Sequence, residues 1–276
     1  MTTTPADSDL KRLFVYNRSV PDLETFTRIT AIEHDWIEPL IAGLAERTAP
    51  VASRAAWVER LAGLLAAERE PSPAGRYLAE KATREEFALV VREFGLDGLT
   101  EAQNFFPAVP RLPIRSQMAV MRVLIDEFGC GNLQQAHSQL YLNLLGELGL
   151  PRTVDDLLDL TSDETFAFLD VFFWLTQRAP HIEYFLGALA YLEASIPAAF
   201  TVQARACERL GIENGRYYTE HLHIDLFHME EMQVAIREYE AVHPLDATKL
   251  WIGATLLSEL LGTAFDSAVE RAREAA

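Results

Sequence analysis

Residues 217–228 have the sequence YYTEHLHIDLFH, which holds three of the chain's seven histidines. On an α-helix each residue advances about 100°, so Asp225 lies about 40° from His221, and His228 about 20° to the other side. His223 points almost the opposite way. Two imidazoles and one carboxylate on a single helical face can converge on a metal ion. A solvated polar stripe is the alternative interpretation of this segment alone.

Helical spacing continues through almost the whole chain, and strand-like alternation is nearly absent. Capping-box spacing places helix starts at Thr83 and Thr161. We expect an all-α bundle of seven or eight long helices, forming one domain over residues 1–276, with residues 1–20 as a partly disordered or extended segment. The expected helices cover about 23–47, 53–70, 83–95, 100–106, 114–128, 137–148, 161–178, 181–210, 217–241 and 246–276.

The net charge of −17 over 276 residues argues against a nucleic-acid partner and against an anionic membrane surface. Cys130 and Cys207 belong to no Cys-x-x-Cys pattern, so no disulfide framework is expected. The N-terminus lacks the layout of a signal peptide. The most apolar stretch, 186–200, contains Glu193 and Pro197 and looks too short to span a bilayer. We therefore expect a cytoplasmic protein without a membrane partner.

Two further carboxylates lie in apolar helices. Glu193 has small or apolar neighbours from Gly187 to Phe200, and Glu127 ends an apolar run that begins at Met118. A lone buried carboxylate costs several kcal/mol unless it is paired or bound to a metal. For Glu193, a buried salt bridge to an arginine is the alternative to metal binding.

His137 follows Glu127 by ten residues, which on an unbroken helix would separate them by about 15 Å. The segment Gly129-Cys-Gly-Asn132 interrupts the helix and can fold the chain back. The candidate metal ligands are then three carboxylates and three imidazoles, a set that suits two ferrous ions and leaves open positions for dioxygen. They are Glu127, His137, Glu193, His221, Asp225 and His228.

The segments DEFGCGNLQQAHS (126–138), AYLEA (190–194) and TEHLHIDLFH (219–228) resemble those of the haem-oxygenase-like diiron oxidases and oxygenases. The resemblance spans roughly residues 83–241, and the ligand types occur in the order Glu, His, Glu, His-x3-Asp-x2-His. It implies a haem-oxygenase-like bundle, a diiron cofactor that cycles between Fe(II) and Fe(III), and O2 as cosubstrate. A ferritin-like site would need two Glu-x-x-His motifs, of which only the half-match at Asp225 and His228 occurs.

Members of this family that oxygenate nitrogen use an additional carboxylate from an earlier core helix. Glu101, which precedes Phe105 and Phe106, is the best-placed candidate for an extra metal ligand. The alternative is an acid in the first turn of a short helix, where it interacts favourably with the helix dipole.

The resemblance implies an O2-activating oxidoreductase of specialised metabolism, in natural product biosynthesis. We expect C–H oxidation of a small amino-acid-type substrate, by desaturation, cyclisation or oxidative C–C fragmentation. N-oxygenation of an amine or amino acid is one alternative, and a metal-free helical ligand-binding or regulatory protein is another. An external electron donor and a homodimer are left open. A substrate carboxylate would need a cationic partner, for which the candidates are Arg122, Arg178, Arg216 and Arg237.

Overall fold

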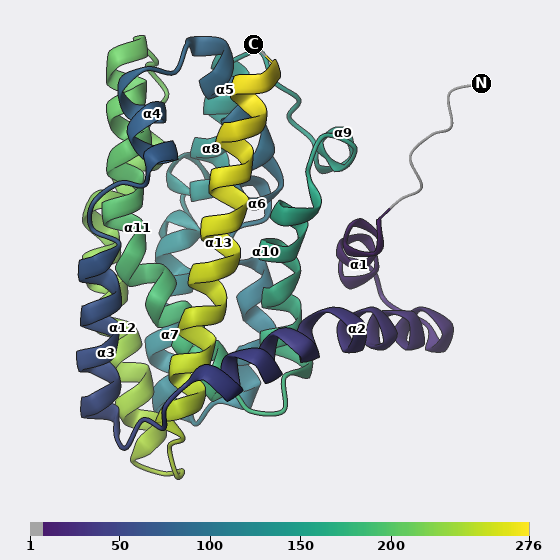
Figure 1. The fold of residues 1–276 in the computed structure, drawn as a ribbon, viewed down its shortest axis with the longest axis vertical. Coiled ribbons are helices and arrows are strands. Elements are labelled where there is room, and N and C mark those ends of the chain that lie inside the picture. The colour runs from purple at the N-terminus through teal and green to yellow at the C-terminus, as the bar shows by residue number, and fades with distance from the viewer. Residues whose placement is uncertain (1–7, 276) are drawn as a thin grey trace.

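The computed structural model describes residues 8–275, apart from the side chains at positions 223 and 225. Over these residues the chain forms α-helices joined by short 3-10 and π segments, with no strand, which confirms the predicted all-α bundle (Figure 1). The helices are α1 (Asp9–Asn17), α2 (Leu23–Arg47), α3 (Arg54–Ala67), α4 (Pro73–Glu80), α5 (Arg84–Glu93), α6 (Gly95–Thr100), α7 (Ile114–Glu127), α8 (His137–Glu147), α9 (Val154–Leu158), α10 (Asp163–Phe173), α11 (Glu183–Leu210), α12 (Arg216–Glu240) and α13 (Ala247–Ala275). The 3-10 segments are η1 (Gln103–Arg111), η2 (Gly129–Gly131) and η3 (Leu133–Gln135), and η4 (Trp174–Arg178) is a π-helix.

The helix starts follow side-chain caps, and one predicted start was wrong. The capping box at Thr83 is present, with the Thr83 hydroxyl accepting from the backbone N–H of Glu86. α10, however, is capped by Ser162, which accepts from the N–H of Thr165. The hydroxyl of Thr161 instead donates to the carbonyl of Leu157. Adjacent Thr and Ser can both cap, so the sequence alone does not decide between them.

The expectation that residues 1–20 form a partly disordered or extended segment does not hold for residues 9–17, which form α1. Ser8 caps α1 by accepting from the backbone N–H of Lys11. Leu13 and Phe14 are completely buried, and the Phe14 ring lies 5.6 Å from that of Phe166 on α10. This helix is held by tertiary packing, because nine residues are too few for a stable isolated helix.

α11 is the central helix, packed against α12 on one side and against α13 on the other. Its contact with α13 is a close crossing of backbones, because a Cβ added at Gly187 would overlap the carbonyl of Leu250. The apolar stretch 186–200 was expected to be too short to span a bilayer, but α11, which contains it, has 28 residues. By length and composition alone this helix could cross a membrane. About half of its most apolar window is buried in the bundle (56%), as in the core helix of a globular protein.

Candidate metal centre

The chain reverses direction between Glu127 and His137, as predicted from the break at residues 129–132. Gly129, Cys130 and Gly131 have φ values of +62°, +52° and +83°, in the left-handed region that permits a sharp turn. A Cβ at Gly129 would lie 2.5 Å from a backbone nitrogen of the returning chain, so only glycine fits there. The turn brings Nδ1 of His137 to 2.7 Å from Oε2 of Glu127.

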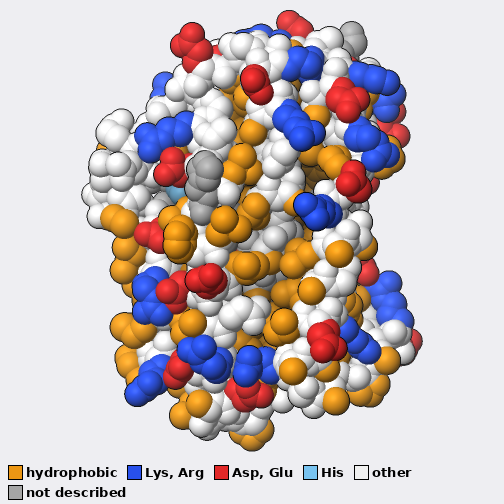
Figure 2. Space-filling view, turned by 90° about the vertical axis from the view of Figure 1, so that its left-hand side faces the viewer, with side chains coloured by type: hydrophobic (Ala, Val, Ile, Leu, Met, Phe, Trp, Pro, Cys, Tyr) orange, Lys and Arg blue, Asp and Glu red, His pale blue; other side chains and the backbone are white. Residues whose placement is uncertain are grey.

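α12 buries polar side chains and exposes apolar ones, which is the reverse of an ordinary surface helix. Its polar His221 and His228 are each 1% exposed, whereas Leu226 and Phe227 are 55% and 63% exposed. On the face of the bundle that carries α3, α11 and α12, apolar side chains gather along the middle of the surface (Figure 2). A helix that buries imidazoles and exposes apolar side chains loses hydrophobic stabilisation, which indicates that the buried face serves a ligand. Asp225 was predicted on this face, but its side chain lies outside the described part.

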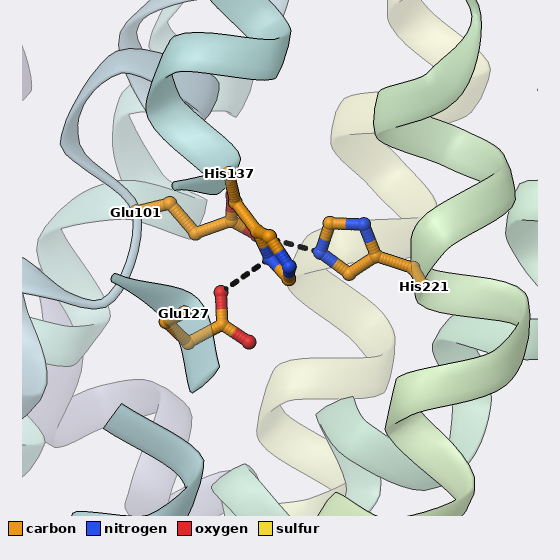
Figure 3. Close-up of side chains that lie close together, drawn as sticks. All are labelled: Glu101, Glu127, His137 and His221. Carbon is orange, nitrogen blue, oxygen red and sulfur yellow. Dashed lines mark ion pairs between the residues drawn. The ribbon is translucent and has the colours of Figure 1, made fainter. Parts of the chain in front are cut away.

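Four ligand-type side chains meet in a first cluster, from four separate segments of the chain (Figure 3). Their ligand atoms all lie within 4.8 Å of one another. Nε2 of His221 is 3.3 Å from Oε1 of Glu101, and the rings of His137 and His221 have centroids 4.1 Å apart. The members of the cluster are Glu101, Glu127, His137 and His221.

A second cluster consists of Glu127, Glu193 and His228, again with ligand atoms within 4.8 Å. Nδ1 of His228 lies 3.1 Å from Oε2 of Glu193 and 3.4 Å from Oε1 of Glu127. Glu127 therefore belongs to both clusters, and it turns a different oxygen towards each: Oε2 towards His137 and Oε1 towards His228.

The backbone fixes the ring of His221. Its Nδ1 is 2.7 Å from the carbonyl oxygen of Tyr217, so Nδ1–H donates and the lone pair of a neutral ring is at Nε2. Nε2 is the atom that faces Glu101 in the first cluster. Such an outer hydrogen bond is the usual way in which a protein orients a metal-binding imidazole.

The donor set fits iron. Oε2 of Glu101, Oε2 of Glu127 and Nδ1 of His137 are buried and form no hydrogen bond of suitable geometry with any described residue. Burial raises the pKa of Glu127, but the nearby imidazoles, led by His137, outweigh this effect and leave it lowered. No lysine or arginine within residues 8–275 pairs with Glu101 or Glu127, so a bound cation would satisfy atoms that are otherwise costly to bury. Carboxylate oxygens and imidazole nitrogens together are ligands that iron accepts.

Two residues beside the clusters were not predicted. Oδ2 of Asp126 lies 3.5 Å from Nε2 of His228, and the Tyr217 hydroxyl donates to Oε1 of Glu101 at 3.1 Å. Tyr217 precedes His221 by four residues, so helical spacing could have indicated that it faces the site. Nothing in the sequence places Asp126 against His228, since that contact joins α7 to α12.

A cavity of about 310 Å³ leads to both clusters. Glu101, Glu127, Glu193 and His221 form part of its wall. Most of the remaining wall is apolar and aromatic, which excludes water and suits the body of a small organic ligand. Phe94, Phe105, Phe168, Phe172, Phe200 and Phe265 contribute to it.

None of the four arginines considered as carboxylate partners lines this cavity. Each forms an ion pair elsewhere, the most buried being Arg178 with Glu33 at 2.5 Å. The other pairs are Arg122–Glu231, Arg216–Glu220 and Arg237–Glu238. Arg69, which is exposed, is the arginine that the described cavity wall contains.

Residues 88–262 match a family of iron-containing redox enzymes, and the match covers more than half of the chain. The chain belongs to this family. Membership confirms the predicted haem-oxygenase-like fold and the assignment as an iron-containing oxidoreductase. The matched residues of the family include both clusters, from Glu101 to His228. A comparison with curated proteins found no match.

Proposed function

We propose that the protein is a non-haem diiron oxidoreductase that uses O2 to oxidise a small molecule bound in the cavity. The observation that carries this proposal is the shared position of Glu127, whose two oxygens face two separate groups of ligands. A carboxylate in that position can bridge two metal ions, as in other two-metal sites. One ion would be held by Glu101, Glu127, His137 and His221, and the other by Glu127, Glu193 and His228, with Asp225 as the further ligand predicted from the sequence.

When bound, the two irons would supply the electrons that reduce O2. The chain supplies the surroundings. Tyr217 donates to Glu101 and so fixes one carboxylate, and its own carbonyl accepts from His221. The aromatic wall keeps water away from the reacting atoms and holds the substrate beside the clusters.

C–H oxidation of an amino-acid-type substrate is one candidate reaction. In a desaturation the substrate loses two hydrogen atoms, which are two protons and two electrons, and an external reductant adds two more electrons with two protons, so that O2 leaves as two waters. The described wall offers the carboxylate of an amino acid one arginine and no lysine, namely Arg69 at the exposed end of the cavity.

N-oxygenation of an amine is the second candidate, and one observation favours it. Glu101 lies inside the first ligand cluster, where the family resemblance places the additional carboxylate of nitrogen-oxygenating members. In this reaction one oxygen atom is inserted into an N–H bond. The other leaves as water, with two electrons and two protons supplied by an external reductant.

Iron loading followed by exposure to oxygen tests the proposal. The metal-free protein is titrated anaerobically with Fe(II), freed of excess metal and analysed for iron, and we expect two irons per chain. The loaded protein is then mixed with O2, a chemical reductant and a panel of amines and amino acids. Products two hydrogens lighter indicate C–H oxidation, and products one oxygen heavier indicate N-oxygenation. If no iron binds, the proposal is wrong, and the result favours the alternative of a metal-free ligand-binding or regulatory protein.

A further inference from the structure

The charges on the cavity wall are unequal. Besides the cluster residues, three carboxylates line the described wall, namely Glu68, Asp97 and Asp266, and the one arginine or lysine is Arg69. Two Fe(II) ions would offset the four proposed carboxylate ligands. The remaining wall would still carry more negative than positive charge, so an anionic guest is disfavoured and a cationic guest favoured.

The distribution of these charges matters as much as their sum. Glu68, Arg69 and Asp266 are exposed at the mouth, and Glu68 is held there by the hydroxyls of Tyr191 and Ser258, at 2.7 and 2.6 Å. Asp97 lies on α6, one turn before Glu101, and is therefore on the metal side of the cavity.

Asp97 is the acidic group of the inner wall that is not a proposed metal ligand. No described lysine or arginine forms an ion pair with it. Gln203 adds a second acceptor to the same wall: it is 9% exposed, and its Oε1 is buried without a hydrogen bond to any described residue.

We propose that the cavity selects a small amine with an apolar body and no carboxylate, with Asp97 facing its ammonium group. This inference rests on the proposed function and specifies its substrate class. An alkylammonium group is cationic at neutral pH, like that of lysine. The volume of about 310 Å³ lies at the lower end of the range of small-molecule sites, which suits a body of one ring or a short chain. A carboxylate on such a molecule would meet Asp97 in the interior, and Arg69 at the mouth is the one arginine or lysine that the described wall offers it.

Two matched series of ligands test the inference by titration calorimetry on anaerobic, Fe(II)-loaded protein. The first contains 2-phenylethylamine, 2-phenylethanol, 3-phenylpropanoate and phenylalanine. The second contains hexylamine, hexanol, hexanoate and norleucine. We expect the amine of at least one series to bind about tenfold more tightly than its alcohol, the difference that a charged hydrogen bond provides. The carboxylate and the amino acid should bind more weakly than the alcohol.

Substitutions locate the preference. Asp97→Asn should reduce the advantage of the amine over the alcohol to less than about threefold while leaving alcohol affinity unchanged. Asp155→Asn, an exposed acid on α9 outside the cavity wall, should change neither affinity and serves as the matched control. Arg69→Gln should not weaken amine binding.

Two results would overturn the inference. One is that neither amine binds more tightly than its alcohol, which needs no variant and does not depend on how Asp97→Asn folds. The other is that an amino acid binds as tightly as the amine and loses affinity in Arg69→Gln, which would place a substrate carboxylate at the mouth. The iron content of each sample separates this failure from that of the proposed function, because selectivity for an amine and binding of two irons are measured independently.

Discussion

Nε2 of His228 lies 3.5 Å from Oδ2 of Asp126, while Nδ1 of the same ring faces Glu193. Asp126 immediately precedes Glu127, so two consecutive carboxylates face the two nitrogens of the His228 ring: Asp126 faces Nε2 and Glu127 faces Nδ1. A carboxylate behind a metal-binding imidazole orients the ring and raises its basicity. We predict that Asp126→Ala weakens Fe(II) binding at this cluster by about 10- to 100-fold, and that Asp126→Asn, which retains an acceptor, has a smaller effect.

To test this prediction, the affinity of the two sites for Fe(II) or Co(II) is measured in the Asp126 variants. The absorption spectrum of bound Co(II) shows whether the metal ligands have changed. Glu231→Ala is the matched control, because Glu231 also joins α12 to α7, through an ion pair with Arg122, but without contact to a cluster. Equal metal affinity in Asp126→Ala and Glu231→Ala would show that Asp126 does not position His228.

The shared position of Glu127 predicts a graded loss of iron. Glu193→Ala should reduce the iron content from two to one per chain, because it removes a ligand of the second cluster alone. His137→Ala should do the same for the first cluster. Glu127→Ala should reduce the content of both sites, because each uses one oxygen of this carboxylate. Iron analysis after anaerobic loading measures the iron content of all three variants. If either site of Glu127→Ala still binds a full equivalent of iron, Glu127 does not bridge the two sites.

Much of this centre follows from local rules. Helical periodicity places His221 and His228 on one face, and both are buried in the same face of α12. The glycine-containing break predicts the approach of Glu127 and His137, which the structure confirms. Glu193 could be recognised as buried because the helix around it is apolar. In each case the chemistry of a residue conflicts with its apolar surroundings, and such conflicts mark functional positions.

Other features depend on contacts between segments that are far apart in the sequence, so local sequence patterns do not predict them. Residues 1–20 were expected to be partly disordered or extended, but Leu13 and Phe14 are buried and Phe14 packs α1 against α10. Whether Arg178 or Arg122 is free to reach a substrate depends on the ion pairs Arg178–Glu33 and Arg122–Glu231, whose partners are more than a hundred residues apart in the sequence. The position of Asp126 against His228 is of the same kind.

A buried acid away from the metal centre predicts a pH dependence of stability. Asp170 on α10 is completely buried. Its burial raises its pKa by more than Asn17 and Arg178 lower it. Burial, and then repulsion from Glu33, raises its pKa well above the unfolded value of about 3.9. The native state therefore binds more protons than the unfolded state above about pH 4, and the free energy of unfolding falls as pH rises towards the raised pKa.

Asp170→Asn removes this titratable group. The free energy of unfolding of the variant should therefore fall less as pH rises from about 4 towards the raised pKa of Asp170. We expect the variant to be more stable than the parent protein at pH 7 by on the order of 1–2 kcal/mol. Urea unfolding at pH 5 and pH 7.5 measures the difference. Asp35→Asn, an exposed acid on α2, should leave the profile unchanged. A variant less stable than the parent at both pH values would mean that the Asp170 carboxylate is stabilised as an anion.

The crossing of α11 and α13 sets the last prediction, because α11 also carries Glu193. A Cβ at Gly187 would overlap the carbonyl of Leu250, and one at Gly253 would overlap the carbonyl of Tyr184, so each helix has a glycine where the other backbone passes. Backbone atoms cannot rotate away as side chains do, and we expect Gly187→Ala to lower the free energy of unfolding by about 1–3 kcal/mol. Gly262→Ala on α13 meets nothing within 4 Å and should raise it by up to about 1 kcal/mol. If thermal unfolding shows equal effects for the two variants, the helices are not in backbone contact, and the placement of Glu193 must depend on other packing.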